Sequence, residues 1–379
     1  MWLAKIGVLD YIQSENVANA GEVGIKIGKD FIDWSIAHIA EFGDTDVFPY
    51  PVELKFLQDK QDDIAVELAT WDAAQHHPIS LIESLVPKTR YGFRMAHQIN
   101  LADLVFFTAI VLSLVEKLEA GRDPASNMRA FSYRLSSVGD PALFDQSRKF
   151  KNWIQYIQGT VWFLDEYSHV VVTDVSDFYA RIYRHRLENI IESITGDARS
   201  TKIIEAQLKD WRSRQSFGIP VGGSAARILA EVALNDTDLA LASEGYDSTR
   251  YVDDIMLFIR KGQDPYAALG FLANHLGINE GLALNNQKTR IITWDEFQQK
   301  FDQSSGEDDD AAHEAAVERL FWAAYGEDDG DAEALEKLRL LDLQTELEAE
   351  IEEPLWDMGK VRILLKGTSK NCPDLAAAV

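Results

Sequence analysis

Two adjacent aspartates interrupt an apolar stretch in the run "STRYVDDIMLFIRKG", where Asp253 and Asp254 directly precede "IMLFI". Burying a charge costs several kcal/mol unless a partner satisfies it. The pair therefore belongs either to a surface turn with both acids in water or to a turn whose acids hold metal ions. The second interpretation requires further oxygen ligands from another part of the chain.

A third aspartate follows a run that is typical of a β-strand. "HVVVTDV" (169–175) is rich in β-branched residues and predicts a strand that ends near Asp174. Two hairpin-like strands would bring Asp174 to Asp253 and Asp254. Three close carboxylates repel one another unless divalent cations lie between them, and Mg²⁺ prefers oxygen ligands. Two such ions can activate a hydroxyl and stabilise a leaving oxygen in phosphoryl transfer.

The pattern along the chain predicts an α+β fold. Helical spacing dominates the N-terminal part, as in "DFIDWSIAHIAEF" (30–42), and helices then alternate with short β-rich runs. An acidic, alanine- and leucine-rich region follows and predicts solvated helices. We expect four segments: a helical N-terminal extension (1–89), a central domain (90–301), an acidic helical insertion or linker (302–353) and a short C-terminal segment (354–379).

The charge distribution bears on the kind of partner. The net charge of −25, from 62 acidic and 37 basic residues, argues against nucleic acid as a partner. Residues 1–89 contain 15 acids and 6 bases and residues 302–353 contain 19 and 3, whereas residues 90–301 contain 26 and 24. A basic groove in the central domain is therefore compatible with the sequence. The acidic region itself would mimic nucleic acid, bind a partner or keep the chain soluble.

Three features of the sequence bear on the cellular location of the protein. The longest apolar run, "LVFFTAIVLSLV" (104–115), is too short to cross a bilayer and predicts a buried helix. The N-terminus lacks the layout of a signal peptide. The single cysteine, Cys372, excludes an intramolecular disulfide. We expect a cytoplasmic protein that does not bind membranes.

Several motifs occur in an order that resembles the reverse transcriptases. "TDVSDFYARI", "GIPVGGSAARILAEVALNDTD" (218–238), "RYVDDIMLF" and "LALNNQKTRIITW" (282–294) are similar to four palm motifs of that family. Upstream, "YGFRMAHQINLADLV" and "FSYRL" (131–135) resemble its fingers motifs. The resemblance covers roughly residues 88–295. It implies a right-hand polymerase fold with fingers and palm, and a short thumb-like segment beginning after residue 353.

The resemblance also implies the metal ligands and the catalytic residues. Asp174 and Asp253 would bind two Mg²⁺ ions, with Mn²⁺ as a substitute, helped by Asp254 and the Val175 carbonyl. Lys288 would protonate or neutralise the leaving pyrophosphate. The alternative for Lys288 is an ordinary surface lysine.

The nucleotide-binding residues follow from the same resemblance. Tyr179 would exclude a ribose 2′-hydroxyl, although an ordinary core aromatic is the alternative, and Gly222 would let backbone approach the nucleotide. Arg94 and Arg134 would grip the triphosphate. Arg90 competes with them, and helix-to-helix ion pairing would explain any of the three. The family's usual glutamine beside Gly222 is replaced by Val221, which puts templated base selection in doubt.

Together with "GDTDVFPYP" (43–51), these motifs resemble the bacterial abortive-infection and defence-associated reverse transcriptases. That resemblance implies antiphage defence through DNA synthesis that is directed by RNA, unusually templated or untemplated. The implied partners are deoxynucleoside triphosphates, a nucleic-acid template, primer or product, and a non-coding RNA or second protein, in an oligomer. The alternative is a partner-dependent or scaffold subunit that retains the palm fold.

Overall fold

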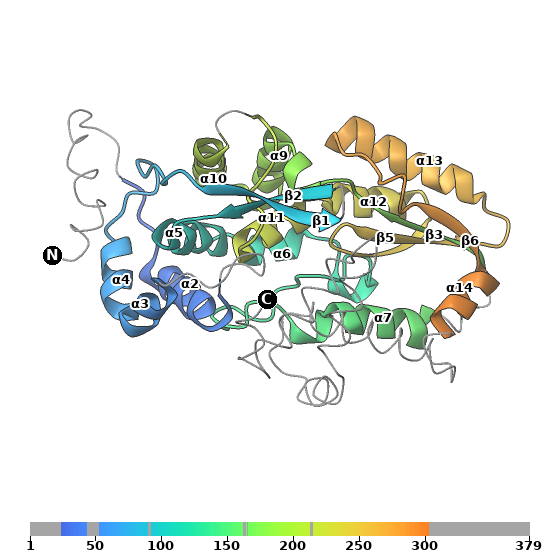
Figure 1. Cartoon of the computed structure of the whole chain (residues 1–379), viewed down its shortest axis with the longest axis horizontal. Helices are drawn as coiled ribbons and strands as arrows, with labels where there is room; N and C mark the ends of the chain where they lie inside the picture. Colours follow the sequence, from blue (N-terminus) through green and yellow to red (C-terminus); the bar gives the residue numbers. More distant parts are fainter. Residues whose placement is uncertain are drawn as a thin grey trace, which may run out of the picture.

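The computed structural model describes residues 24–43, 53–89, 92–161, 164, 166–212 and 215–302. Helices cover both faces of a small antiparallel sheet, and a separate two-stranded ribbon lies above a buried helix (Figure 1). The predicted mixture of helix and sheet is confirmed. The expectations for residues 303–379, including the acidic region and the thumb-like segment, lie outside the described residues.

The central sheet contains the three β-rich runs of the sequence. Its spatial order is β4-β5-β3-β6, and every neighbouring pair is antiparallel. The strands are β3 (Tyr167–Asp174), β4 (Asp247–Tyr251), β5 (Asp254–Arg260) and β6 (Arg290–Thr293). Tyr251 pairs with Asp254, so only Val252 and Asp253 form the turn between β4 and β5.

Side chains alternate between the two faces of this sheet, as the twofold period of a strand requires. Val171 and Leu257 belong to the larger core, which includes residues of α13 (Pro265–His275). Their neighbours Val170 and Phe258 belong to a second core with Trp153 and Trp294. Because β3 and β5 contribute to both cores, these two strands contain nearly continuous apolar runs rather than alternating ones.

The N-terminal part is helical only up to residue 68. Within the described residues it forms α2 (Lys29–Phe42), α3 (Glu53–Asp59) and α4 (Gln61–Leu68). Residues 82–89, which end the segment predicted as a mainly helical N-terminal extension (1–89), form β1 (Ile82–Thr89), paired with β2 (Gly92–Gln98). Pairing with a later segment decides this ribbon, so helical periodicity upstream does not extend into it.

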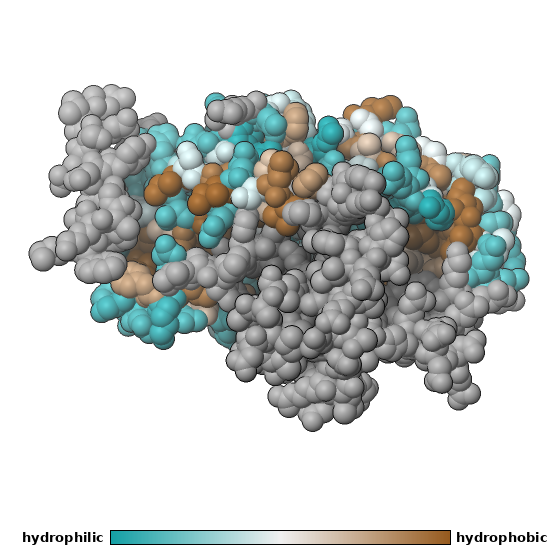
Figure 2. Space-filling view, viewed as in Figure 1, coloured by the Kyte–Doolittle hydropathy of each residue, from teal (hydrophilic) through white to brown (hydrophobic). Residues whose placement is uncertain are grey.

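The ribbon exposes an apolar surface. Ile82, Leu85 and Phe93 are each at least 60% exposed. Figure 2 shows apolar residues on the same part of the molecular surface, surrounded by hydrophilic ones. A two-stranded ribbon has little stability by itself. The contact between His97 on β2 and Arg212, at the end of a helix, helps to hold the ribbon in place.

The longest apolar run forms a buried helix, as predicted. It begins after Asn100, whose side chain accepts a hydrogen bond from the Ala102 amide at 3.0 Å and caps the helix. All residues from Asp103 to Leu112 are buried. No helix among the described residues is long and apolar enough to cross a membrane.

Some of the remaining helices pack on the sheet, and others pack on the helices beside it. Beyond α5 (Leu101–Leu112) and α6 (Val115–Gly121) come α7 (Phe150–Gly159), α8 (Phe178–Arg181), α9 (Arg184–Thr195), α10 (Ala198–Trp211), α11 (Ser224–Ala233), α12 (Asn235–Ser243) and α14 (Trp294–Asp302). The described residues also include the short 3₁₀ helices η2 (Ala125–Asn127) and η3 (Gln146–Arg148) and the π-helix η5 (Leu276–Glu280).

A buried histidine joins the N-terminal helices to the rest. The His38 ring accepts a hydrogen bond from the Ser224 hydroxyl at 2.6 Å through Nε2, and its Nδ1–H donates to the Pro141 carbonyl at 2.7 Å. This pattern requires the neutral ring. Burial lowers the pKa of His38 to about 4, although the hydrogen bond to Pro141 acts in the opposite direction.

We predict that His38 makes stability fall as the pH drops from about 6.5 towards 4. Over that range unfolded His38 binds a proton and folded His38 does not, so the free energy of unfolding decreases by up to about 1.4 kcal/mol per pH unit. Urea unfolding of wild type and His38→Gln at pH 7.5, 6 and 5 measures this. The decline should be shallower for His38→Gln, and parallel declines would contradict the prediction.

Candidate functional site

The sheet brings the three predicted aspartates to one edge. Asp174 ends β3, Asp254 begins β5, and the two are direct cross-strand partners. Asp253 lies in the turn just before Asp254, and its carbonyl accepts a hydrogen bond from the Val175 amide at 3.2 Å. The antiparallel pairing of β3 with β5 is thus the reason why residues far apart in sequence meet here.

A fourth predicted residue joins this edge from the segment before β6. Lys288 Nζ lies 2.5 Å from Asp174 Oδ2. The Asn285 amide donates to the Asp174 carbonyl at 2.7 Å and the Ser176 amide to the Ala283 carbonyl at 2.8 Å, so the segment "LALNNQK" is held directly against Asp174. Asn285 also donates from its side chain to Asp174 at 3.2 Å. We had not singled out Asn285, although its place in that motif was a signal.

The charges at this edge are strongly unbalanced. Burial, then the neighbouring charges of Asp254 and Asp174, raise the pKa of Asp253 to about 7. Partial burial opposes the charge of Lys288, but its hydrogen bond to Asp174 and the three carboxylates outweigh this and raise the pKa of Lys288. One ammonium thus faces three carboxyl groups, which is an arrangement that favours additional positive charge.

The donor atoms suit a hard divalent cation. Carboxylate oxygens are the ligands that Mg²⁺ prefers, and the excess negative charge is what such an ion compensates. As placed here, no three acidic or histidine side chains among the described residues are arranged to hold a metal ion. Asp174 is instead paired with Lys288. The donor atoms of these residues therefore suit a metal ion. The ammonium group of Lys288 would compete with that ion for the carboxylate of Asp174.

The turn that carries Asp253 has an unusual backbone. Val252 has a φ of +56°, a left-handed conformation that is a genuine outlier for a β-branched residue and costs on the order of 1–3 kcal/mol. Its amide donates to the Ser132 hydroxyl at 2.8 Å, and its carbonyl accepts from Arg250 Nη1 at 3.0 Å. Both polar groups of the strained residue are therefore held by side chains.

Those two side chains belong to a buried ionic network. Arg250 donates to Asp238 at 2.8 Å from both Nε and Nη2 and to Glu231 at 2.9 Å, and the Ser132 hydroxyl donates to Glu231. Arg122 also donates to Glu231, at 2.6 Å. These residues are not among those predicted from the sequence; the available signal was the charge of Glu231 within the apolar run "ILAEVAL".

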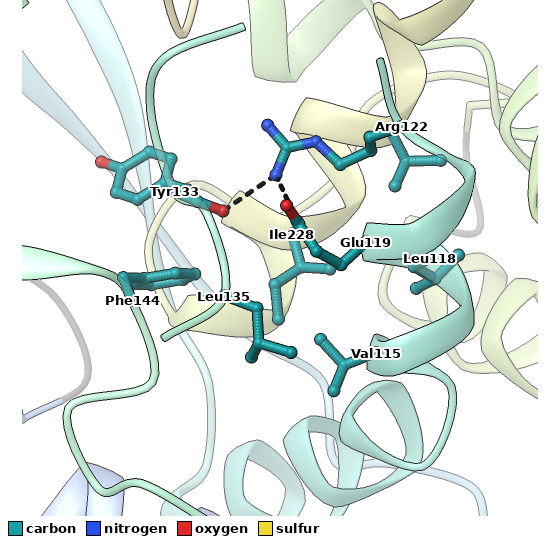
Figure 3. A pocket seen from close by; sticks show the side chains of 9 residues that line it. Val115, Leu118, Glu119, Arg122, Tyr133, Leu135, Phe144 and Ile228 are labelled. Atoms are coloured by element: carbon teal, nitrogen blue, oxygen red, sulfur yellow. Dashed lines mark hydrogen bonds and ion pairs between the residues drawn. The ribbon is translucent and has the colours of Figure 1, made fainter. Parts of the chain in front are cut away.

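A small pocket lies beside this network. Figure 3 shows Arg122 donating to Glu119 and to the Tyr133 carbonyl, with Leu135, Phe144 and other apolar side chains around them. The cavity volume of about 10 Å³ leaves room for about one water molecule. It is far too small for a nucleotide.

The predicted nucleotide-binding loop lies against the segment that follows Asp174. The Ile219 amide donates to the Tyr179 carbonyl at 2.9 Å, which places "GIPVGG" beside the partly buried Tyr179. Gly222 has a φ of +106°, a conformation that favours glycine. The Val221 amide donates to Nδ1 of buried His97 on β2 at 3.1 Å, so the loop is also tied to the ribbon.

The two arginines predicted to bind the triphosphate are Arg134 and Arg94. Arg134 is 2% exposed and donates to the Ala130 carbonyl, the Asp123 carbonyl and Glu119. Arg134 is therefore engaged with protein acceptors, and its predicted contact with a triphosphate stays a prediction. Arg94 lies on β2, and its side chain, like all of Arg90, lies outside the described part of the chain.

Comparison with known proteins identifies the family. The family model described as reverse transcriptase (RNA-dependent DNA polymerase) matches residues 86–318. This range includes the three aspartates and Lys288. The chain belongs to the reverse transcriptase family. Membership in this family supports the predicted polymerase fold with palm and fingers. No curated protein matches this reverse transcriptase.

Solved structures with similarity include two yeast telomerases. Telomerase from Candida albicans in complex with a TWJ fragment of telomeric RNA matches at 14% identity over 64% of this chain and 48% of that chain, with a TM-score of 0.39. Apo telomerase from Candida tropicalis matches at 12% identity over 85% and 64%, with a TM-score of 0.41. The chain thus spans between about half and just under two thirds of the length of these proteins.

We predict that Asp253→Asn stabilises the metal-free protein. The pKa of Asp253 is higher in the folded state than in the unfolded state. The free energy of unfolding therefore falls as the pH rises from about 4 to 7, because the folded state disfavours the charged carboxylate. Asparagine removes that loss. In EDTA at pH 8 the melting temperature should rise by a few °C, and by less at pH 5. The exposed Asp295→Asn serves as the matched control. An equal change in both variants would contradict the prediction.

Proposed function

We propose that this reverse transcriptase is a Mg²⁺-dependent DNA polymerase that acts in bacterial antiphage defence. The observation that carries the proposal is the convergence of Asp174, Asp253 and Asp254 at one sheet edge with Lys288 beside them. Clustered charges of this kind are costly, and sites with perturbed pKa values are commonly catalytic. Polymerisation is the reaction of the family that uses such a cluster.

The carboxylates would hold the metal ions. Asp174, Asp253 and Asp254, with the Val175 carbonyl, would bind two Mg²⁺ ions, or Mn²⁺ in their place, which when bound activate the attacking hydroxyl and stabilise the leaving oxygen. The short hairpin between β4 and β5 keeps Asp253 and Asp254 on rigid elements. Fixed ligands of this kind reduce the reorganisation needed at the moment of reaction.

Lys288 would assist the leaving group. Its side chain is 53% exposed, so it can move from Asp174 towards a bound substrate. The carboxylates that raise its pKa keep it protonated at neutral pH. A protonated amine at this edge would donate a proton to the pyrophosphate or neutralise its charge. Replacement of the Lys288–Asp174 pair by metal at Asp174 would release the lysine for that role.

The substrate would be a deoxynucleoside triphosphate. Tyr179 packs partly against the core beside the "GIPVGG" loop, and from there it would clash with a ribose 2′-hydroxyl. Gly222 would allow close approach of the backbone. Val221 replaces the family's usual glutamine, which supports synthesis that is unusually templated or untemplated as well as RNA-directed synthesis.

The defence role rests on similarity of motifs. "FSYRL" and "GIPVGGSAARILAE" resemble the bacterial defence-associated group. We propose that the chain works in the cytoplasm with nucleic acid as template, primer or product. We further propose that it assembles with itself, with a non-coding RNA or with a second protein.

The second candidate is a scaffold subunit that retains the palm fold without polymerising. The observation in its favour is the 2.5 Å pair between Lys288 and Asp174, which neutralises a metal ligand. A deoxynucleoside triphosphate with Mg²⁺ separates the two candidates, since it should raise the melting temperature of a polymerase and leave that of a scaffold unchanged.

We predict that Asp253→Asn abolishes nucleotide incorporation. Purified protein is incubated with Mg²⁺ and each labelled deoxynucleotide, singly and mixed, without added template. The variant should lose more than about a hundredfold of the rate, because even the outer partners of a metal ligand can cost that much. Full incorporation by the variant would overturn the assignment of catalysis. In phage-challenged cells the same variant should lose protection, and retained protection would contradict the link to defence.

We predict that Tyr179→Val admits ribonucleotides. The smaller side chain leaves space for a 2′-hydroxyl, so the ratio of ribonucleotide to deoxynucleotide incorporation should rise at least about tenfold. Tyr179→Phe retains the ring and should keep the wild-type ratio. The ratio is measured as kcat/KM for each triphosphate, and an unchanged ratio in Tyr179→Val would make Tyr179 a core residue only.

A further inference from the structure

Ser132 occupies a particular place relative to the aspartate turn. It is fully buried, and its hydroxyl makes two hydrogen bonds in opposite directions: it donates to Glu231 and accepts from the Val252 amide at 2.8 Å. A hydroxyl has one donor hydrogen, so its orientation is set by the carboxylate. The lone pairs are thereby left to face the turn.

The opposite side of the same residue is held by Arg250. Its Nη1 donates to the Val252 carbonyl at 3.0 Å and to Glu231 at 2.9 Å. Glu231 therefore anchors both groups that bind Val252, one through each carboxylate oxygen. The side chain of Glu231 is fully buried, so water does not compete for these bonds.

The segment that carries Ser132 is itself fixed to β4. The Phe131 amide donates to the Arg250 carbonyl at 3.0 Å, and the Arg250 amide donates to the Arg129 carbonyl at 2.6 Å. Ala130 and Arg250 form a parallel bridge. The segment that carries the Ser132 hydroxyl is thus bound to β4, although it lies about 120 residues before the turn in sequence.

We propose that Ser132 is a positioning residue for Asp253. Together with Arg250, and oriented by Glu231, it holds Val252 in the left-handed conformation that aims the following carboxylate at the edge shared with Asp174. Without the hydroxyl, Val252 returns to an ordinary backbone conformation and Asp253 is displaced. The proposal rests on the catalytic role of Asp253 proposed above, because displacement by about 1 Å of a reacting group can cost a hundredfold in rate.

The first experiment compares two serine deletions of equal size. Ser132→Ala removes the clamp, and Ser35→Ala is the matched control because Ser35 is also fully buried and its hydroxyl donates once, to the Val105 carbonyl at 2.8 Å. Deoxynucleotide incorporation gives kcat and KM, and thermal unfolding gives the melting temperature. We expect Ser132→Ala to lower kcat at least tenfold, with KM within threefold and a melting temperature close to that of Ser35→Ala. Equal kcat in the two variants would overturn the proposal.

A double-mutant cycle with Val252→Gly tests the backbone explanation. Glycine adopts positive φ without a steric penalty, so the clamp should matter less in its presence. Ser132→Ala should therefore change kcat by less than threefold in the Val252→Gly background. A tenfold loss in both backgrounds would mean that the two residues act independently, and the positioning role would be wrong.

A crystal structure of Ser132→Ala tests the effect of the hydroxyl on Val252 without an activity measurement. We expect Val252 at negative φ and Asp253 displaced from Asp174, whereas an unchanged turn would overturn the proposal. If wild type incorporates nothing, the proposed function fails and this structural comparison still tests the clamp. If Ser132→Ala does not fold, a structure of Ser132→Cys, which weakens both hydrogen bonds at nearly the same volume, provides the same comparison.

Discussion

The ion pairs of the buried Arg250 guanidinium are the interactions on which the aspartate edge of the sheet depends. Arg250 is 2% exposed and meets two carboxylates, Glu231 and Asp238. A buried charge is tolerated only when partners compensate it, and removal of one partner costs about 3–5 kcal/mol. A slip of β4 by one residue would turn Arg250 to the other face of the sheet. The network therefore specifies the register that places Asp253 in the turn and Asp254 opposite Asp174.

The same edge contains two features that oppose folding. Three carboxyl groups lie close together, so that the pKa of Asp253 is raised to about 7, and Val252 has positive φ. Neither would persist without support from the surroundings, because strained or repulsive groups survive only where the rest of the structure holds them. Local conflict of this kind is expected at functional sites. Here the compensation comes from Lys288 on one side and from Ser132 and Arg250 on the other.

Long-range contacts also hold the loop "GIPVGG", which we propose binds the nucleotide. His38 on α2 bonds to Ser224 at the start of α11, and His97 on the ribbon bonds to the Val221 amide in the preceding loop. Both histidines are buried, and burial lowers the pKa of each to about 4. They therefore act as neutral hydrogen-bonding groups at neutral pH. The N-terminal helices and the ribbon thus both fix the segment that we propose contacts the nucleotide.

Local pattern in the sequence determined β3, β5, the buried helix predicted from the apolar run 104–115 and the aspartates at strand ends, because β-branched and apolar runs express preferences of neighbouring residues. The order of the motifs determined the family. Only the tertiary structure decided that residues 82–89 pair as a strand, that Arg134 is buried with protein acceptors, and that Ser132 and Glu231 support the turn. Each of these depends on a partner that folding brings from a distant part of the chain, and no local pattern records that partner.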